Sequence, residues 1–423
     1  MKKYPEYINS DIAWIGNIPS HWKIKHLRSY LRMVSDKGHP NETLLSVTRE
    51  QGVIVRNVES KEENHNFIPD DLTNYKLVKV GQFAINKMKS WQGSYAVSKF
   101  QGIVSPAYYV CELNFPNKDF FSWAIRSKSY IPFFTQYSKG IRVDQWDLSP
   151  IALKSIPFIE PPIEEQNSIV GFISDKVAKI DTLISKTEEE INLLNELKQA
   201  EVARLVTRGL NPNVQMKDSG ITWIGKIPAH WQIRKIKFLF EERTVKNHPN
   251  EPMLCATQAY GVIPQSLYDN RVVVVNTGFE NLKLVEEGDF VISLRSFQGG
   301  IEYAHYRGII SAAYTILRSN GVLSNDYTRY LFKCFPFIQL LKTCVKGIRE
   351  GQNINYDMLR NNFLFIPPKE EQKAIVSAIN ENNKKIDTLT SQLSNQITYL
   401  KELKQRVISD AVTGKIDVRD YKN

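Results

Sequence analysis

The stretch Trp14-Ile15-Gly16-Asn17-Ile18-Pro19-Ser20-His21-Trp22 decides the fold, because it occurs again as Trp223-Ile224-Gly225-Lys226-Ile227-Pro228-Ala229-His230-Trp231. Further pairs follow in the same order, and their displacement falls only from 209 to 206 residues. The pairs are His39-Pro40-Asn41-Glu42 with His248-Pro249-Asn250-Glu251, Trp91-Gln92-Gly93 with Phe297-Gln298-Gly299, Lys139-Gly140-Ile141-Arg142 with Lys346-Gly347-Ile348-Arg349, Pro161-Pro162-Ile163-Glu164-Glu165-Gln166 with Pro367-Pro368-Lys369-Glu370-Glu371-Gln372, and Lys179-Ile180-Asp181-Thr182-Leu183 with Lys385-Ile386-Asp387-Thr388-Leu389. The chain is therefore a tandem duplication, and a duplicated fold typically builds a pseudo-two-fold object.

Each repeat begins with a globular segment. Residues 1–160 and 209–366 are rich in β-branched and aromatic residues with frequent Gly and Pro, which predicts short strands, loops and a few helices. In both repeats, Pro-Pro-x-Glu-Glu-Gln marks the change to a helical pattern, because Pro and acidic residues suit the first turn of a helix. We predict an α+β protein of two similar α/β domains, 1–160 and 209–366, separated by helical spacers at 161–208 and 367–423.

The two spacers have the apolar spacing of a coiled coil. Apolar residues alternate at intervals of four and three, which produces a seam along one side of each helix. The seam residues predicted to pair the helices are Ile173, Val177, Ile180, Ile184, Ile191 and Leu194 in the first spacer and Ile379, Ile386, Leu393, Ile397 and Leu400 in the second. About 40 helical residues span roughly 60 Å, more than a domain of this size needs as a packing helix. We expect the helices to pair antiparallel; the alternative is that each folds back on its own domain.

Composition places the chain among ordinary globular proteins, with 423 residues, 42% hydrophobic and 24% charged. The N-terminus lacks the apolar run of a signal peptide and no stretch of about 18 apolar residues occurs, so we expect a cytoplasmic protein without membrane contact. Cys111, Cys255, Cys334 and Cys344 have no metal-ligand spacing, and we interpret them as reduced structural thiols. No metal site is predicted.

The net charge of +10 is concentrated in the globular segments. Residues 1–160 hold 21 lysines and arginines against 15 acidic residues, and residues 209–366 hold 18 against 13, whereas residues 161–208 hold 6 against 9. This distribution favours phosphate contact by the two globular domains. A solvated basic surface with no ligand would look the same on charge alone.

The two repeats differ most usefully at one short segment. Thr48-Arg49-Glu50-Gln51-Gly52 corresponds to Thr257-Gln258-Ala259-Tyr260-Gly261, so the frame is kept while the polar residues change. Arg suits guanine and Gln suits adenine in the major groove, which makes Arg49, Gln51, Gln258 and Tyr260 candidate base-reading residues. Drift in an unused loop remains the alternative.

Two further regions are candidates for DNA contact. The segment 86–93 and its counterpart 293–299 both keep a basic residue, an aromatic residue and a Gln-Gly pair, and we expect Trp91 and Phe297 to be core residues there. The Lys-Gly-Ile-Arg segments combine two cations with a glycine that allows close backbone approach; an ordinary basic turn is the alternative. The candidates from both regions are Lys87, Lys89, Gln92, Lys139, Arg142, Arg295, Gln298, Lys346, Arg349, Gln352 and Asn353. We expect the Trp and His residues of the opening motif to be structural.

The combination of paired opening motifs, Lys-Gly-Ile-Arg segments and Pro-Pro-x-Glu-Glu-Gln entries into Lys-Ile-Asp-Thr-Leu helices resembles the specificity subunits of Type I restriction-modification enzymes, over nearly the whole chain. The resemblance implies two target recognition domains that each read half of a gapped double-stranded DNA site, with helices that set the gap and dock two methyltransferase subunits. It also implies restriction subunits as further partners. S-adenosylmethionine, ATP and Mg²⁺ would serve those partners, with no cofactor in this chain.

Catalytic motifs are missing from the sequence. Gly220-Ile221-Thr222-Trp223-Ile224-Gly225-Lys226 has phosphate-loop spacing, but Ile227 replaces the required Ser or Thr. The chain also lacks the Asn-Pro-Pro-Phe/Tyr or Asp-Pro-Pro-Tyr tetrad of amino-group methylation. We therefore predict a non-catalytic subunit. A protein-interaction scaffold without its own DNA readout is the alternative function, and an enzyme that acts alone is a weaker one.

Overall fold

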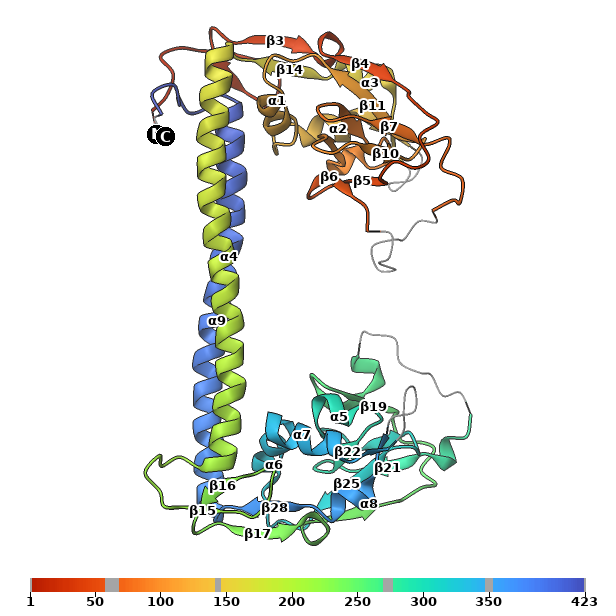
Figure 1. Ribbon diagram of the computed structural model, residues 1–423, viewed down its shortest axis with the longest axis vertical. Helices are drawn as coiled ribbons and strands as arrows, with labels where there is room; N and C mark the ends of the chain where they lie inside the picture. Colours follow the sequence, from red (N-terminus) through yellow and green to blue (C-terminus); the bar gives the residue numbers. More distant parts are fainter. Residues whose placement is uncertain (1, 58–67, 141–145, 269–276, 347–352, 422–423) are drawn as a thin grey trace. The chain divides into compact units, whose positions relative to one another are not determined.

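The computed structural model describes residues 2–57, 68–140, 146–268, 277–346 and 353–421. Its contacts divide the chain into two compact units, unit 1 with Met1–Thr187 and Asn395–Asn423 and unit 2 with Glu188–Ser394. Each unit holds one globular module and half of each of two long helices, α4 (Ile163–Arg208) and α9 (Lys369–Val412) (Figure 1). The two classes of segment predicted from the sequence, globular and helical, are both present, and the α+β class is confirmed.

The two long helices pack against one another within each unit. In unit 1 the first half of α4 runs antiparallel to the last half of α9, and Lys404 Nζ lies 2.7 Å from Asp181 Oδ1. In unit 2 the equivalent ion pair joins Lys198 Nζ to Asp387 Oδ1 at 2.6 Å. Both aspartates belong to the repeated Lys-Ile-Asp-Thr-Leu segment, so the repeat places the same pairing residue in each unit.

The predicted seam residues line the inner side of this packing to different degrees. Six of them are buried, namely Ile173, Val177, Ile180, Ile184, Ile379 and Ile386. Five are half-buried, namely Ile191, Leu194, Leu393, Ile397 and Leu400. Burial is most complete toward the ends of the pair, because there the modules cover the helices as well: Ile173 and Val177 share one apolar core with Val407 and Ile408.

The module of unit 1 is built from antiparallel strand pairs around one four-stranded sheet of order β4-β11-β8-β9. Its strands are β1 (Tyr7–Asn9), β2 (Asn17–Pro19), β3 (Lys23–His26), β4 (Leu31–Val34), β5 (Leu45–Thr48), β6 (Gly52–Val55), β7 (Lys76–Val78), β8 (Phe83–Ile85), β9 (Tyr95–Val97), β10 (Gly102–Val104), β11 (Tyr109–Leu113), β12 (Ser138–Lys139), β13 (Asp147–Leu148) and β14 (Pro157–Glu160). Its helices are η1 (Leu27–Ser29), η2 (Ser90–Gln92), α1 (Lys118–Ile125), α2 (Ile131–Tyr137) and α3 (Pro150–Ser155). Strand β14 pairs with β3 and leads directly into α4.

The module of unit 2 repeats this plan, with a four-stranded sheet of order β18-β25-β22-β23. Its strands are β15 (Met216–Asp218), β16 (Lys226–Pro228), β17 (Gln232–Lys235), β18 (Phe240–Arg243), β19 (Leu254–Thr257), β20 (Gly261–Pro264), β21 (Lys283–Val285), β22 (Phe290–Ile292), β23 (Glu302–Tyr303), β24 (Gly308–Ile310), β25 (Thr315–Ser319), β26 (Val345–Lys346), β27 (Asn353–Ile354) and β28 (Phe363–Ile366). Its helices are η4 (Ile236–Phe238), η5 (Gln265–Leu267), η6 (Phe279–Asn281), α5 (Ser296–Gly299), α6 (Asn325–Lys333), α7 (Phe335–Thr343) and α8 (Tyr356–Arg360).

The residues after α9 differ from what the periodicity predicts. The segment 367–423 reads as a helical spacer, but α9 ends at Val412 and the following residues form turns. Ile416 and Val418 are buried in the core of unit 1, and Asp417 N donates to the carbonyl of Lys2 at 2.9 Å. The final residues therefore complete the module of unit 1 instead of extending the helix.

All four cysteines are free and buried, and burial raises the pKa of the Cys111 and Cys334 thiols to about 12. Since the thiolate is the reactive form, we expect none of them to react with a thiol reagent at pH 8 within minutes in the native protein. Four equivalents should react after denaturation. A spectrophotometric thiol count checks this, and rapid labelling of one site in the folded chain would contradict it.

In the part of the chain that the structure describes, no helix is both long and apolar enough to cross a bilayer. The same residues contain no group of three or more His, Cys, Asp or Glu side chains arranged to hold a metal ion.

Candidate nucleic-acid interface

The variable segment forms the tip of a hairpin in both units. In unit 1, Thr48 Oγ1 donates to the carbonyl of Gly52 at 3.1 Å and accepts from Gln51 N at 3.2 Å, and this closes the turn between β5 and β6. In unit 2, Thr257 makes the same two bonds, to the Gly261 carbonyl and from Tyr260 N, at 3.0 Å each. Gly52 and Gly261 have φ of +77° and +72°, a conformation that glycine adopts without a steric penalty. The frame is therefore the same turn twice.

The side chains carried by this frame are exposed and differ between the units. Arg49 and Gln51 project from the tip in unit 1, and the Arg49 guanidinium lies 3.3 Å from the Glu50 carboxylate. Gln258 is exposed in unit 2, and Tyr260 is 63% exposed. An exposed tyrosine on a fixed turn is available for a ligand.

The second predicted region follows β8 and β22. Lys89 and Arg295 are exposed at the N-terminal ends of η2 and α5, while Gln298 is exposed and Gln92 half-buried. Lys87 instead forms an ion pair with Asp147, with Nζ and Oδ2 2.8 Å apart, and Asp147 raises the pKa of Lys87. A phosphate would have to compete with that carboxylate for Lys87.

The expectation that Trp91 and Phe297 are core residues is wrong, because both are only half-buried. Trp91 packs on the Trp146 ring, with centroids 5.3 Å apart, in a surface cluster outside the main core. Trp91 therefore supports the surface segment that carries Gln92.

The described residues of the Lys-Gly-Ile-Arg segments lie beside this region. Lys139 is exposed on β12 and is the register partner of Asp147 on β13. Asp147 is also the residue that forms the ion pair with Lys87, so both lysines lie near the same carboxylate. In unit 2, Lys346 on β26 pairs in register with Asn353 on β27, whose side chain is exposed. The remaining predicted residues, Arg142, Arg349 and Gln352, lie outside the described residues.

A cleft of about 530 Å³ in unit 1 brings two of the predicted regions together. It is lined by Arg49 and Glu50 of the hairpin, by Gln92, by Arg126 and Lys128 at the end of α1, and by α9 residues that include Lys401, Glu402 and Lys404. Five of these eight side chains are cationic and two are anionic. The cleft therefore holds more cationic than anionic side chains, although Lys404 is paired with Asp181 and Arg126 binds the carbonyls of Arg49 and Glu50. An excess of positive charge suits contact with a phosphate backbone.

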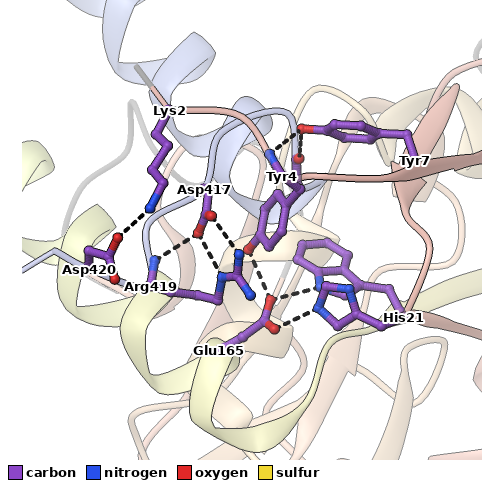
Figure 2. A network of polar contacts seen from close by, with 10 residues as sticks. Lys2, Tyr4, Tyr7, His21, Glu165, Asp417, Arg419 and Asp420 are labelled. Atoms are coloured by element: carbon purple, nitrogen blue, oxygen red, sulfur yellow. Dashed lines mark hydrogen bonds and ion pairs between the residues drawn. The ribbon is translucent and has the colours of Figure 1, made fainter.

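In unit 1 the opening motif binds the start of α4 through Glu165 (Figure 2). Glu165 Oε2 accepts hydrogen bonds from Trp22 Nε1 and the Tyr4 hydroxyl, each at 2.9 Å, and Glu165 Oε1 lies 2.6 Å from His21 Nε2. Burial and the Glu165 charge hold the pKa of Tyr4 well above its ordinary value. Glu165 is the second glutamate of Pro-Pro-x-Glu-Glu-Gln, so the two repeated motifs bind one another in unit 1.

Unit 2 contains the same junction. Glu371 Oε2 accepts from Trp231 Nε1 at 2.9 Å and lies 2.8 Å from His230 Nε2. The histidines are partly exposed and bind the helix carboxylates, while Trp22 and Trp231 are buried. Trp14 is 40% exposed and Trp223 half-buried, so only the second tryptophan of each motif is a core residue.

Polar contacts tie the last residues into the junction of unit 1 (Figure 2). Arg419 forms an ion pair with Asp417 at 2.7 Å, and its guanidinium lies 4.9 Å from the centre of the Tyr4 ring. Lys2 Nζ contacts Asp420 Oδ2 at 2.5 Å. The start and end of the described chain therefore form one substructure around the Glu165 carboxylate.

Known proteins share this architecture. The family model of the Type I restriction modification DNA specificity domain matches residues 228–399. A putative type I restriction enzyme MjaX specificity subunit from Methanocaldococcus jannaschii is 23% identical over 96% of both chains. Both matches support a Type I restriction-modification specificity subunit.

Solved structures share the fold of this chain. One, described as the structural basis of complex assembly and conformational transition of the type I R-M system, superimposes with a TM-score of 0.57 at 15% identity, covering 94% of this chain and 99% of that one. The HsdS subunit from Thermoanaerobacter tengcongensis gives 0.50 at 16% identity, covering 94% and 98%. The matched domain runs from the opening motif of unit 2 into α9, so it includes both a module and the helix that the module fastens.

Two residues that contact the hairpins were missed by the sequence reasoning. Arg126 donates to the carbonyls of Arg49 and Glu50, and Lys333 donates to the carbonyl of Gln258. The signal that could have found them is the duplication, because both are the basic residue at the end of the same helix, 207 positions apart.

Proposed function

We propose that each module of this DNA specificity subunit reads one part of a two-part DNA sequence through its hairpin tip and the basic segments beside it. The observation that carries the proposal is the identical Thr-to-Gly turn with different exposed side chains, Arg49 and Gln51 in one unit and Gln258 and Tyr260 in the other. A constant scaffold with variable polar tips is what recognition of two different base sequences requires. The target would then be asymmetric.

Charge supports DNA contact by the modules. Their excess of Lys and Arg, and the cationic cleft that contains Arg49, Gln92 and Lys128, suit the phosphate contacts that orient a protein on a duplex. Direct base contacts from the tips would add sequence preference to that positioning.

A protein-interaction scaffold predicts a different salt response. We expect the purified chain, alone or with its modification subunits, to bind its selected duplex with an affinity that falls by about 10³–10⁵ between 50 and 200 mM salt if it makes 6–10 phosphate contacts. Gel shifts at rising salt, with a scrambled duplex as the control, measure this. Equal binding of both duplexes at every salt concentration would favour the scaffold.

We further propose that the chain has no catalytic centre and that partner subunits supply the chemistry. Two modification subunits would transfer methyl groups from S-adenosylmethionine to adenine, and restriction subunits would use ATP and Mg²⁺. The proposed location is the cytoplasm, where such an assembly would meet DNA. Methyl transfer to DNA by the purified chain alone would refute the non-catalytic assignment.

The helices carry a candidate docking surface for the modification subunits. Leu183 and Leu389 close the two Lys-Ile-Asp-Thr-Leu segments and are 50% and 47% exposed, whereas Asp181 and Asp387, two residues earlier, face the other helix. The same apolar residue thus faces outward once in each unit. A surface that occurs twice suits a partner that binds twice.

Replacing both leucines by aspartate is therefore expected to weaken binding of the modification subunits by at least about tenfold per site, because burial of a leucine contributes about 1.5–3 kcal/mol. Calorimetric titration with the modification subunit measures the change. Ser185→Asp with Ser391→Asp is the matched control, since these residues are also exposed and equivalent in the two helices. Equal weakening by both pairs would indicate a charge effect and contradict leucine docking.

A further inference from the structure

A basic side chain lies beneath the tip of each hairpin. In unit 1 it is Arg126, the residue that ends α1, and in unit 2 it is Lys333, the last residue of α6. The two helices begin with equivalent side-chain caps, Asn117 and Ser324. The duplication therefore places a cationic side chain beneath the hairpin tip in both modules, an arginine in unit 1 and a lysine in unit 2.

Arg126 binds two carbonyl groups of the tip of unit 1 and one of strand β9. Its Nη2 donates to the carbonyls of Arg49 and Glu50 at 3.0 and 2.9 Å, and its Nη1 donates to the carbonyl of Tyr95 at 2.7 Å. The guanidinium also packs closely against the turn, because a Cβ added to Gly52 would stand only 3.1 Å from Nη1. A planar fork of fixed donors can orient several carbonyls at once, which an ammonium group cannot do.

Lys333 holds the tip of unit 2 more loosely. Its Nζ donates to the carbonyl of Gln258, the counterpart of Arg49, at 3.4 Å, and forms an ion pair with Glu302 Oε1 at 2.6 Å. The Glu302 side chain is 3% exposed and takes the position that Ala96 has in unit 1. The lysine therefore neutralises a buried carboxylate and contacts the tip at the same time.

These contacts constrain the outward side chains. When the carbonyls of the tip are held toward the helix, the side chains of Arg49, Gln51, Gln258 and Tyr260 remain directed at solvent on a fixed turn. Preorganisation of this kind raises affinity and discrimination because less conformational freedom is lost on binding. Arg126 and Lys333 are committed to protein carbonyls and to Glu302, which leaves them poorly placed to serve as phosphate ligands.

We propose that Arg126 and Lys333 are positioning residues that set the conformation of the two base-reading tips, and through it the sequence preference of each module. The inference rests on the proposed function, since it assigns a role in DNA reading to residues that do not touch DNA. It also predicts an asymmetry between the units: the tip of unit 1, with two carbonyl contacts to Arg126 against one to Lys333 in unit 2, is the more rigid reader.

The test uses the full chain and three duplexes. One duplex carries the two-part sequence that the wild-type chain enriches from a randomised double-stranded pool, and the other two have one part scrambled each. We expect Arg126→Met to lose about tenfold in its preference for the intact duplex over one of the scrambled duplexes, the size of one good base contact, and to keep its preference over the other. Lys333→Met should show the reverse pattern.

A salt titration distinguishes positioning from phosphate contact. A residue that binds a phosphate lowers the slope of log affinity against log salt by about 0.9 when it is removed, whereas a positioning residue leaves the slope unchanged. We expect unchanged slopes for Arg126→Met and Lys333→Met. Arg126→Lys should recover part of the lost preference, because a lysine can still hold one carbonyl, as Lys333 does in unit 2.

Arg32 on β4 forms an exposed ion pair with Glu112 on β11. Arg32→Met removes this positive charge and should change neither the sequence preference nor the salt slope beyond its small effect on net charge. Retained binding of mixed-sequence DNA at low salt shows that a variant is folded. A slope lowered by about one, equal loss against both scrambled duplexes, or unchanged preference overturns the proposal. A wild-type chain that enriches no sequence overturns the proposed function itself.

Discussion

Replacement of Trp231 by alanine is expected to lower the free energy of unfolding of unit 2 by about 3–5 kcal/mol, the usual loss when a buried large aromatic is truncated. Trp231 is fully buried, stacks on Phe365 with ring centroids 5.4 Å apart, and donates its indole N–H to Glu371. Truncation removes the apolar contact and also leaves Glu371 with one donor fewer in a partly buried position, where an unsatisfied carboxylate is costly.

Hydrogen exchange followed by mass spectrometry suits this prediction, because it reports each unit separately. Amides of β17, β28 and the start of α9 should lose protection, while those of unit 1 should not. Trp223→Ala is the control, since Trp223 belongs to the same motif but is only half-buried and should cost less. Equal effects of the two substitutions would contradict the assigned importance of the Trp231–Glu371 junction.

Exchange of the hairpin tip is expected to change which bases are read. The triple variant Gln258→Arg, Ala259→Glu, Tyr260→Gln gives unit 2 the tip of unit 1 on an unchanged Thr-to-Gly turn. Each bidentate base contact contributes about 1–3 kcal/mol of discrimination, so the preferred base at the contacted positions should change by a factor of about ten or more. Only the part of the site read by unit 2 should be affected.

Selection from a randomised duplex pool measures this exchange. Tyr306→Phe is the matched control, because it transfers the equivalent residue of module 1, Phe100, at an exposed position outside the tip. It should leave the selected sequence unchanged. If the tip exchange weakens binding but leaves the base preference intact in both parts, the hairpins do not read bases.

The fold was largely predictable from the duplication. Pro-Pro-x-Glu-Glu-Gln placed both helix starts within two residues of Ile163 and Lys369, since Pro and acidic residues act locally at a helix N-terminus. The residues after Val412 were not predictable, because their partners, such as Lys2, lie more than 400 positions away and no local periodicity marks them.

The candidate site was predictable only in part. The variable tips could be selected as candidates because two copies of one frame could be compared. The structure shows that Arg49 and Gln92 line one cleft, and their contact with DNA stays a prediction. Arg126 was missed because its role depends on contacts with a turn 76 positions earlier in the sequence. Trp91 was predicted to be a core residue, but it is half-buried and packs on Trp146 in a cluster at the surface.

The most direct test of the central claim is selection of duplexes from a randomised double-stranded DNA pool by the full chain assembled with its modification subunits. We predict two short blocks of fixed sequence, different from one another and separated by a constant number of unspecified base pairs, with enrichment that weakens as salt rises. Enrichment of a single continuous block, or of no sequence while the assembly remains intact, would contradict it.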